Sequence, residues 1–179
     1  CDYNWQSVEM VTSIFVEAAG TMNSLRNGPN LVGPTNHGLP RDDPCDAGGY
    51  YLFISSETGD LCMGKRYTKG VEGKRLCYPL FENGLPVDNW VGLKFAVATV
   101  EDRVDAIQLV AQVKNSGSAA TWSSVATVLD ETGKWNATNA IPQECASSVT
   151  DGQTFFGGKY IQWQTQGARV RFRGMKRNN

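Results

Sequence analysis

GLKFAVATVEDRVDAIQLVAQVK, residues 92–114, is the stretch of sequence that decides the fold class. Apolar residues stand at every second position of its first half, at Leu93, Phe95 and Val97. This period of two is typical of a β-strand with one face in the core. Glu101-Asp102-Arg103 is predicted to form a turn. Residues 104–114 fit a helix or a strand, and Asn115-Ser116-Gly117 favours the strand because it ends the segment like a hairpin.

Short stretches of the same kind, rich in aromatic and β-branched residues, lie on both sides. Strands are predicted at 50–55, 61–68, 74–81, 92–100, 104–114, 121–129, 160–165 and 168–173. The last two flank Gln166-Gly167 and are expected to pair as a hairpin. Short strands with Gly-rich turns are typical of sandwiches and barrels. We therefore expect a mainly β (α+β) fold, an antiparallel β-sandwich or barrel stapled by disulfides.

The N-terminal part is expected to differ from the rest. Apolar residues recur there at intervals of three and four, at Val8, Val11, Phe15, Ala18, Ala19 and Met22. This spacing predicts one helix over about 4–25, although its β-branched residues disfavour a helix. Residues 27–49 are rich in Gly and Pro and are predicted to be a long loop. With a β region over 50–179, the chain is expected to be a single domain, 1–179.

Five cysteines are the most informative residues for the class of protein. They are Cys1, Cys45, Cys62, Cys77 and Cys145. No Cys-x-x-Cys pair is present, so two disulfides are favoured over structural zinc. Cys1 has three readings: a disulfide partner that ties down the N-terminus, a lipid-modified first residue, or a free thiol that could link two chains. Four of the five cysteines are expected to pair, and the sequence does not give the pairing.

Several features favour an extracellular protein. Disulfides form in oxidising compartments, and Asn136-Ala137-Thr138 is an acceptor sequence for N-glycosylation. The longest apolar run is too short to span a bilayer, and no charged, apolar leader opens the chain, so any signal peptide is expected to have been removed. The formal net charge of −1 and 41% hydrophobic residues argue against a disordered protein.

Positive charge is concentrated in two segments. Residues 159–179 hold six basic residues and no acidic one, and 62–77 include Lys65 and Arg66. The three arginines at alternate positions of the last predicted strand share one face: Arg169, Arg171 and Arg173. Guanidinium groups in a row suit phosphate, sulfate or carboxylate, which predicts an anionic ligand. The alternative is a solvated strand face whose arginines pair with nearby acidic residues.

Aromatic residues point to a carbohydrate ligand. Tyr160 and Gln162 share one face of their predicted strand, and sugar C–H faces stack on rings while hydroxyls need polar partners. Five tryptophans stand at positions 5, 90, 122, 135 and 163. The alternative is that most of these large rings fill the core.

Catalytic chemistry has weaker support. His37 is the single histidine, and no nucleophile motif accompanies it. The carboxylates of Asp42, Asp43 and Asp46 cluster in one loop and could hold calcium, but their spacing fits no EF-hand, and aspartate before proline is also ordinary turn chemistry. Paired-carboxylate glycoside hydrolysis is compatible with the 18 acidic residues, none of which stands out. No metal or cofactor is predicted.

In general type, the whole chain resembles small secreted proteins of fungi, which implies a role as an effector in virulence or as a binding protein. No motif carries this resemblance, and it assigns no site residue. The first hypothesis is a secreted, non-catalytic, lectin-like or effector binding protein for an anionic or carbohydrate ligand or a host protein. An extracellular polysaccharide hydrolase and a structural or inhibitory protein-binding module are the alternatives. The chain is expected to be a monomer or a disulfide-linked dimer, and nucleic acid is a further possible partner.

Overall fold

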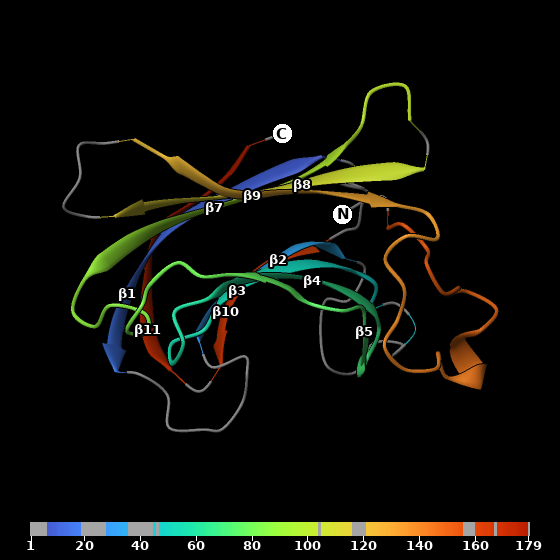
Figure 1. Cartoon of the computed structure of the whole chain (residues 1–179), viewed down its shortest axis with the longest axis horizontal. Helices are drawn as coiled ribbons and strands as arrows, with labels where there is room; N and C mark the ends of the chain where they lie inside the picture. The colour runs from blue at the N-terminus through green and yellow to red at the C-terminus, as the bar shows by residue number, and fades with distance from the viewer. Residues whose placement is uncertain are drawn as a thin grey trace.

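The described part of the chain contains eleven β-strands in two antiparallel sheets and one short 3-10 helix. The structure is a computed structural model, and it describes residues 7–18, 28–35, 45, 47–103, 105–115, 121–155, 160–166 and 168–178. Figure 1 shows the sheets as two layers, with β7, β8 and β9 in the upper layer and β3, β4 and β5 in the lower one.

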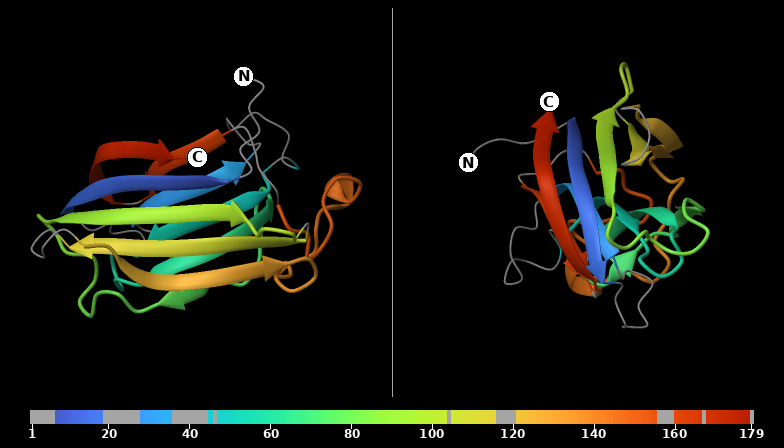
Figure 2. Two further views of the ribbon diagram at one scale, coloured as in Figure 1. Left: turned by 90° about the horizontal axis from the view of Figure 1, so that it is seen from above. Right: turned by 90° about the vertical axis from the view of Figure 1, so that its left-hand side faces the viewer.

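The five-stranded sheet has the order β11-β1-β7-β8-β9, and Figure 2 shows these strands side by side. Their bounds are Arg169–Asn178, Val8–Ala18, Trp90–Thr99, Ala106–Asn115 and Ser123–Glu131. The six-stranded sheet has the order β10-β2-β3-β4-β5, and β6 also pairs with β4. Its bounds are Tyr160–Gln166, Gly28–Thr35, Gly49–Ile54, Leu61–Thr68, Val71–Glu72 and Leu76–Tyr78. Neither run of described strands closes on itself, so the fold is sandwich-like and the barrel alternative is wrong.

The core lies between the two sheets, and residues at alternate strand positions fill it. Leu93, Phe95 and Val97 of β7 are all buried, as their spacing predicts. Leu52 of β3 and Met63 of β4 enter the same cluster from the opposite sheet. On β7 the residues between Leu93, Phe95 and Val97 face outward. The outer face of this strand can therefore carry charged and aromatic side chains.

The helix predicted over 4–25 is wrong within the described residues, because Val8–Ala18 is strand β1. Its buried positions alternate: Val8, Met10, Thr12, Ile14 and Val16. Thr12 hides this period of two in the sequence, since it is polar and yet buried. The Thr12 hydroxyl donates to the backbone carbonyl of Arg173 at 3.3 Å, which satisfies it inside the sheet. The β-branched residues of this segment therefore follow their ordinary preference for strands.

The last predicted hairpin is also wrong in its pairing. Both strands exist, but β10 pairs with β2 in the six-stranded sheet and β11 pairs with β1 in the five-stranded sheet. The chain therefore crosses from one layer to the other between them, instead of turning back within a sheet. In contrast, the pairing of β7 with β8 and of β8 with β9 has the antiparallel register expected of consecutive strands.

The long loop predicted over 27–49 begins with strand β2, which the two prolines had concealed. Gly28 permits this strand, since its φ is +152° and a Cβ there would stand 1.9 Å from the carbonyl oxygen of Ile54. Gly28→Ala is therefore expected to lower the free energy of unfolding by more than about 1 kcal/mol. Gly70→Ala is the matched control, because Gly70 also has positive φ but a Cβ on it would meet no atom within 4 Å. Urea denaturation measures both, and equal losses would contradict the steric argument.

Two disulfides join four of the five cysteines, Cys45 to Cys145 and Cys62 to Cys77. The reading in which Cys1 pairs within the chain is therefore wrong, because its four possible partners pair with one another. Cys1 itself lies outside the described residues. In the part of the chain that is described, no helix is long and apolar enough to cross a membrane.

Candidate functional site

A hollow of about 330 Å³ opens on the outer face of the five-stranded sheet, and we call it the tryptophan groove. Six residues line it: Ser13, Trp90, Gly92, Lys114, Trp122 and Arg173. They come from four strands and from the residue just before β9. The groove therefore unites the aromatic and the basic features that the sequence shows far apart.

The register of the sheet produces the groove. Ser13 of β1 lies opposite Arg173 of β11 on one side and opposite Gly92 of β7 on the other, and Gly92 lies opposite Lys114 of β8. The row therefore has two small residues in the middle and a long cationic side chain at each end. A Cβ on Gly92 would stand 3.1 Å from both the Trp122 ring and the Lys114 Cβ. The absence of a side chain at Gly92 therefore leaves space in the middle of the groove.

Aromatic contacts fix the groove walls. The Trp90 ring lies 5.3 Å from the ring of Phe15, its neighbour across the β1–β7 pair. The guanidinium carbon of Arg173 lies 4.1 Å from the Trp90 ring centroid, and Lys94 Nζ lies 5.1 Å from that of Trp122. Cation–π contacts of this kind hold rings and cations in place at a partly exposed surface.

The three arginines of β11 differ in how they are neutralised. Arg169 and Arg171 both form ion pairs with Glu17, at 2.8 Å and 2.7 Å, as the alternative reading of this row expects. Arg173 has no carboxylate partner among the described residues, and neither has Lys114. None of the six groove residues is acidic. Within the described part of the chain, the groove thus holds two positive charges without a carboxylate partner beside two indole rings.

The other predicted ligand residues lie elsewhere. Lys65 is removed from the predicted surface, because its side chain is fully buried between the sheets. Arg66 is 3.8 Å from Glu72 on the six-stranded sheet, where it also lies over the Tyr51 ring. Tyr160 is exposed and Gln162 half-buried on β10 of that same sheet. The 62–77 segment and the arginine strand therefore do not form one basic surface.

The tryptophans divide between the core and the surface. Trp135 is buried and donates its indole N–H to the carbonyl of Lys74 at 2.7 Å, and Trp163 packs against the core. Trp90 and Trp122 are half-buried on the outer face, where they line the tryptophan groove. The core reading holds for two of the described rings and the surface reading for the other two.

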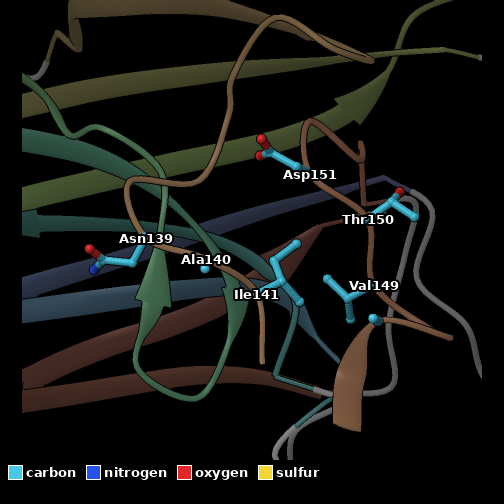
Figure 3. A pocket seen from close by; sticks show the side chains of 7 residues that line it. Asn139, Ala140, Ile141, Val149, Thr150 and Asp151 are labelled. Atoms are coloured by element: carbon cyan, nitrogen blue, oxygen red, sulfur yellow. The ribbon is translucent and has the colours of Figure 1, made fainter. Parts of the chain in front are cut away.

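A second hollow, of about 350 Å³, lies beside the short 3-10 helix η2, Gln143–Cys145. Figure 3 shows the Ile141 and Val149 side chains on facing sides of it. Its carboxylate, Asp151, accepts backbone N–H bonds from Ala137 at 2.7 Å and from Gly152 at 2.9 Å. Asp151 therefore organises the loop around it, and the hollow offers a ligand mainly apolar contacts.

The predicted glycosylation residue, Asn136, has an exposed side chain in this loop region. The hydroxyl of Thr138, the third residue of its acceptor sequence, donates to the carbonyl of Glu72 at 2.8 Å. Asn136 lies beside another hollow, of about 410 Å³, that includes Leu76 and Leu129. The position is accessible, and glycosylation of Asn136 stays a prediction.

A polar cluster is buried between the two sheets. Lys65 Nζ of β4 lies 2.8 Å from Asp130 Oδ2 of β9, and both side chains are 0% exposed. The Tyr50 hydroxyl donates to the same oxygen at 2.5 Å, and Lys65 also donates to the carbonyl of Trp135 at 3.2 Å. The Tyr67 hydroxyl donates to that carbonyl as well. Because the cluster is sealed from solvent, it cannot act on a dissolved substrate.

Burial perturbs the titration of this cluster. Loss of hydration raises the pKa of Asp130 and lowers the pKa of Lys65, and their mutual attraction opposes both shifts. Burial, followed by the Asp130 charge, raises the pKa of the Tyr50 hydroxyl, and burial likewise raises the pKa of Tyr67. The environment therefore favours the uncharged forms of the amine and the acid more than water does.

Sequence reasoning missed three groove residues: Ser13, Gly92 and Lys114. One signal was available, since an isolated glycine inside a strand often marks the close approach of a ligand. Nothing local placed Ser13 or Lys114 beside it, because their neighbourhood depends on strand register. His37, Asp42, Asp43 and Asp46 lie outside the described residues.

Comparison of the chain with protein-family models and with curated proteins found no match.

Proposed function

We propose that this chain is a non-catalytic, extracellular binding protein that takes an acidic carbohydrate in the tryptophan groove. One observation carries the proposal: Arg173 and Lys114, which have no carboxylate partner among the described residues, line a hollow together with Trp90 and Trp122. A uronic or sulfated sugar matches this arrangement, since its C–H face stacks on indole rings and its anionic group accepts from guanidinium and ammonium.

A carbohydrate is favoured over nucleic acid for two reasons. The sequence pI is about 5.9, whereas nucleic-acid-binding domains are usually strongly basic. The groove is also short, with two cations at its ends, instead of a continuous basic track along a backbone. We therefore expect the groove to prefer an acidic carbohydrate to nucleic acid.

The hydrolase alternative gains no support from this site. Glycoside hydrolysis needs two carboxyl groups that face the scissile bond, and the groove lining holds none. Glu9 and Glu17, which lie on the outer face of β1, are engaged with Lys94 and with the first two arginines of β11. A binding role is the simpler reading of this groove.

The test is a binding titration with an acidic oligosaccharide panel, neutral glycans, heparin and single-stranded DNA, at low and raised salt. We expect binding to the acidic sugars that weakens with salt. Arg173→Ala and Trp122→Ala are each expected to cost about 2 kcal/mol, which is roughly thirtyfold in Kd.

Arg169→Ala is the matched control, because Arg169 lies on the same strand face but outside the groove and pairs with Glu17. It is expected to change Kd less than about threefold. Equal losses for Arg169→Ala and Arg173→Ala would mean that diffuse charge, and not the groove, binds the ligand. Preference for DNA over every glycan would replace the proposal with nucleic-acid binding.

A further inference from the structure

We propose that Lys65 and Asp130 condense spontaneously to an isopeptide bond that covalently joins the two sheets. The inference is independent of the proposed function, because it concerns the buried cluster and not the tryptophan groove. Lys65 belongs to β4 of the six-stranded sheet and Asp130 to β9 of the five-stranded sheet, so the link would cross the sandwich.

The geometry brings the reacting atoms together. Lys65 Nζ lies 2.8 Å from Asp130 Oδ2, and one C–O bond beyond that oxygen is the carbonyl carbon, so nitrogen and carbon are at most about 4 Å apart. Both side chains are fully buried in a folded core, which holds them in place. Holding two reactants at this separation replaces much of the entropy cost of a bimolecular condensation.

The dry surroundings oppose the charged pair. The rings of Tyr67 and Phe155 lie 5.0 Å and 5.8 Å from Lys65 Nζ, and Tyr50 and Trp135 are hydrogen-bonded to the pair. Asp130 Oδ1 has no hydrogen-bond partner among the described residues, so the carboxylate is only half satisfied. A buried ion pair costs several kcal/mol of desolvation per ion, and a neutral amide avoids most of that cost.

The condensation balances without any added reagent. A proton passes from Lys65 to Oδ2, which leaves a neutral amine beside a carboxylic acid. The amine lone pair attacks Cγ, and the Nζ–Cγ bond forms. The Cγ–Oδ2 bond then breaks, and Oδ2 leaves as the oxygen of a water molecule. Of the three ammonium protons, two leave with Oδ2 and one stays on the amide nitrogen. Net charge is zero before and after.

Tyr50 is the relay for the second proton. Its hydroxyl already donates to Oδ2 at 2.5 Å, so it can protonate the departing oxygen and recover a proton from the nitrogen. The product also fits its surroundings. The single amide N–H keeps the bond to the Trp135 carbonyl, 3.2 Å from Nζ, and Oδ1 becomes the acceptor available to the Tyr50 hydroxyl.

Mass spectrometry of the wild-type chain, fully reduced and denatured, tests the inference directly. For protein produced without N-glycans, the intact mass is expected to be lower than the sequence mass by one water molecule. Trypsin is expected to fail after Lys65, because its amine is acylated, and to release a branched peptide that contains Lys65 and Asp130. An intact mass equal to the sequence mass overturns the proposal. So does loss of water that maps elsewhere, for example to Asp151-Gly152.

Three variants sharpen the result. Asp130→Ala is expected to show no loss of water, and Asp130→Asn is expected to reach the same linked mass as wild type, since ammonia leaves instead. Tyr50→Phe removes the relay and is expected to form the link about a hundredfold more slowly, read as a lower linked fraction in freshly made protein. Full linkage in Asp130→Ala would overturn the assignment, and if that variant does not fold, the wild-type mass still decides.

Discussion

Replacing both Cys45 and Cys145 by alanine is expected to lower the free energy of unfolding by about 4.7 kcal/mol. Their sequence separation is 100, and a cross-link that closes a loop of about 100 residues removes this much chain entropy from the unfolded state. The bond joins the residues just before β3 to the turn at η2, and Cys145 is buried with Tyr67 and Val149. Its loss therefore loosens the segment that follows β9, which the isolated bridge between Gly73 and Ala137 and a few loop hydrogen bonds also hold.

Cys62→Ala with Cys77→Ala is the matched comparison. This disulfide closes a loop of only 15 residues, for which the same model gives about 3 kcal/mol. It also links β4 and β6 at directly paired positions, so backbone hydrogen bonds keep the strands together without it. Urea denaturation of both double variants measures the difference. A larger loss for the Cys62–Cys77 pair would contradict the loop-entropy account.

Lys65→Met is expected to lower the free energy of unfolding by about 3–5 kcal/mol, because it leaves the Asp130 carboxylate buried without its partner. Lys94→Met is the matched control. Lys94 forms an ion pair with Glu9 at 3.3 Å, but both side chains are partly exposed, and pairs of this kind contribute about 0.2–1 kcal/mol. Denaturation curves of the two variants in one buffer give the comparison.

The double variant Lys65→Met with Asp130→Leu separates the charge from the packing. It removes both ions together, so it is expected to be less destabilised than Lys65→Met alone. Neither variant can form the proposed isopeptide bond, so a linked wild-type chain would make both losses of unfolding free energy larger. The intact mass of the wild-type chain is therefore measured first. Equal effects of Lys65→Met and Lys94→Met would show that burial does not govern the strength of this pair.

The fold class could be predicted because alternation along a strand is a local property. The alternation of Leu93, Phe95 and Val97 on the core side of one strand is enough to indicate a β-strand. The same reasoning failed for β1, where polar Thr12 occupies a core position and the spacing of Val8, Val11 and Phe15 imitates a helix. A short window holds both periods, and the packing of β1 between β7 and β11 selects one.

The candidate site could be predicted only in part. The sequence predicts that Arg173 binds an anion and that an aromatic surface binds a sugar. Nothing in the sequence indicates that these two features lie side by side. They meet because β11 pairs with β1, and β1 with β7, in one particular register. Glu17, more than 150 residues from Arg169 and Arg171, neutralises both through the same pairing. Net charge along the chain could not reveal which of the three arginines at 169, 171 and 173 has no carboxylate partner among the described residues.

By itself the sequence determined a disulfide-containing, mainly β chain with most of its strands in place, because strand periodicity and turn residues act over a few positions. Only the tertiary structure decided which strands pair, which cysteines join and where each charged side chain lies. Lys65 shows the reason most clearly. In the sequence it is one of several cations in a basic segment, and its burial follows from an aspartate 65 positions away on the opposite sheet. Such contacts depend on how two layers pack, and no local pattern encodes that packing.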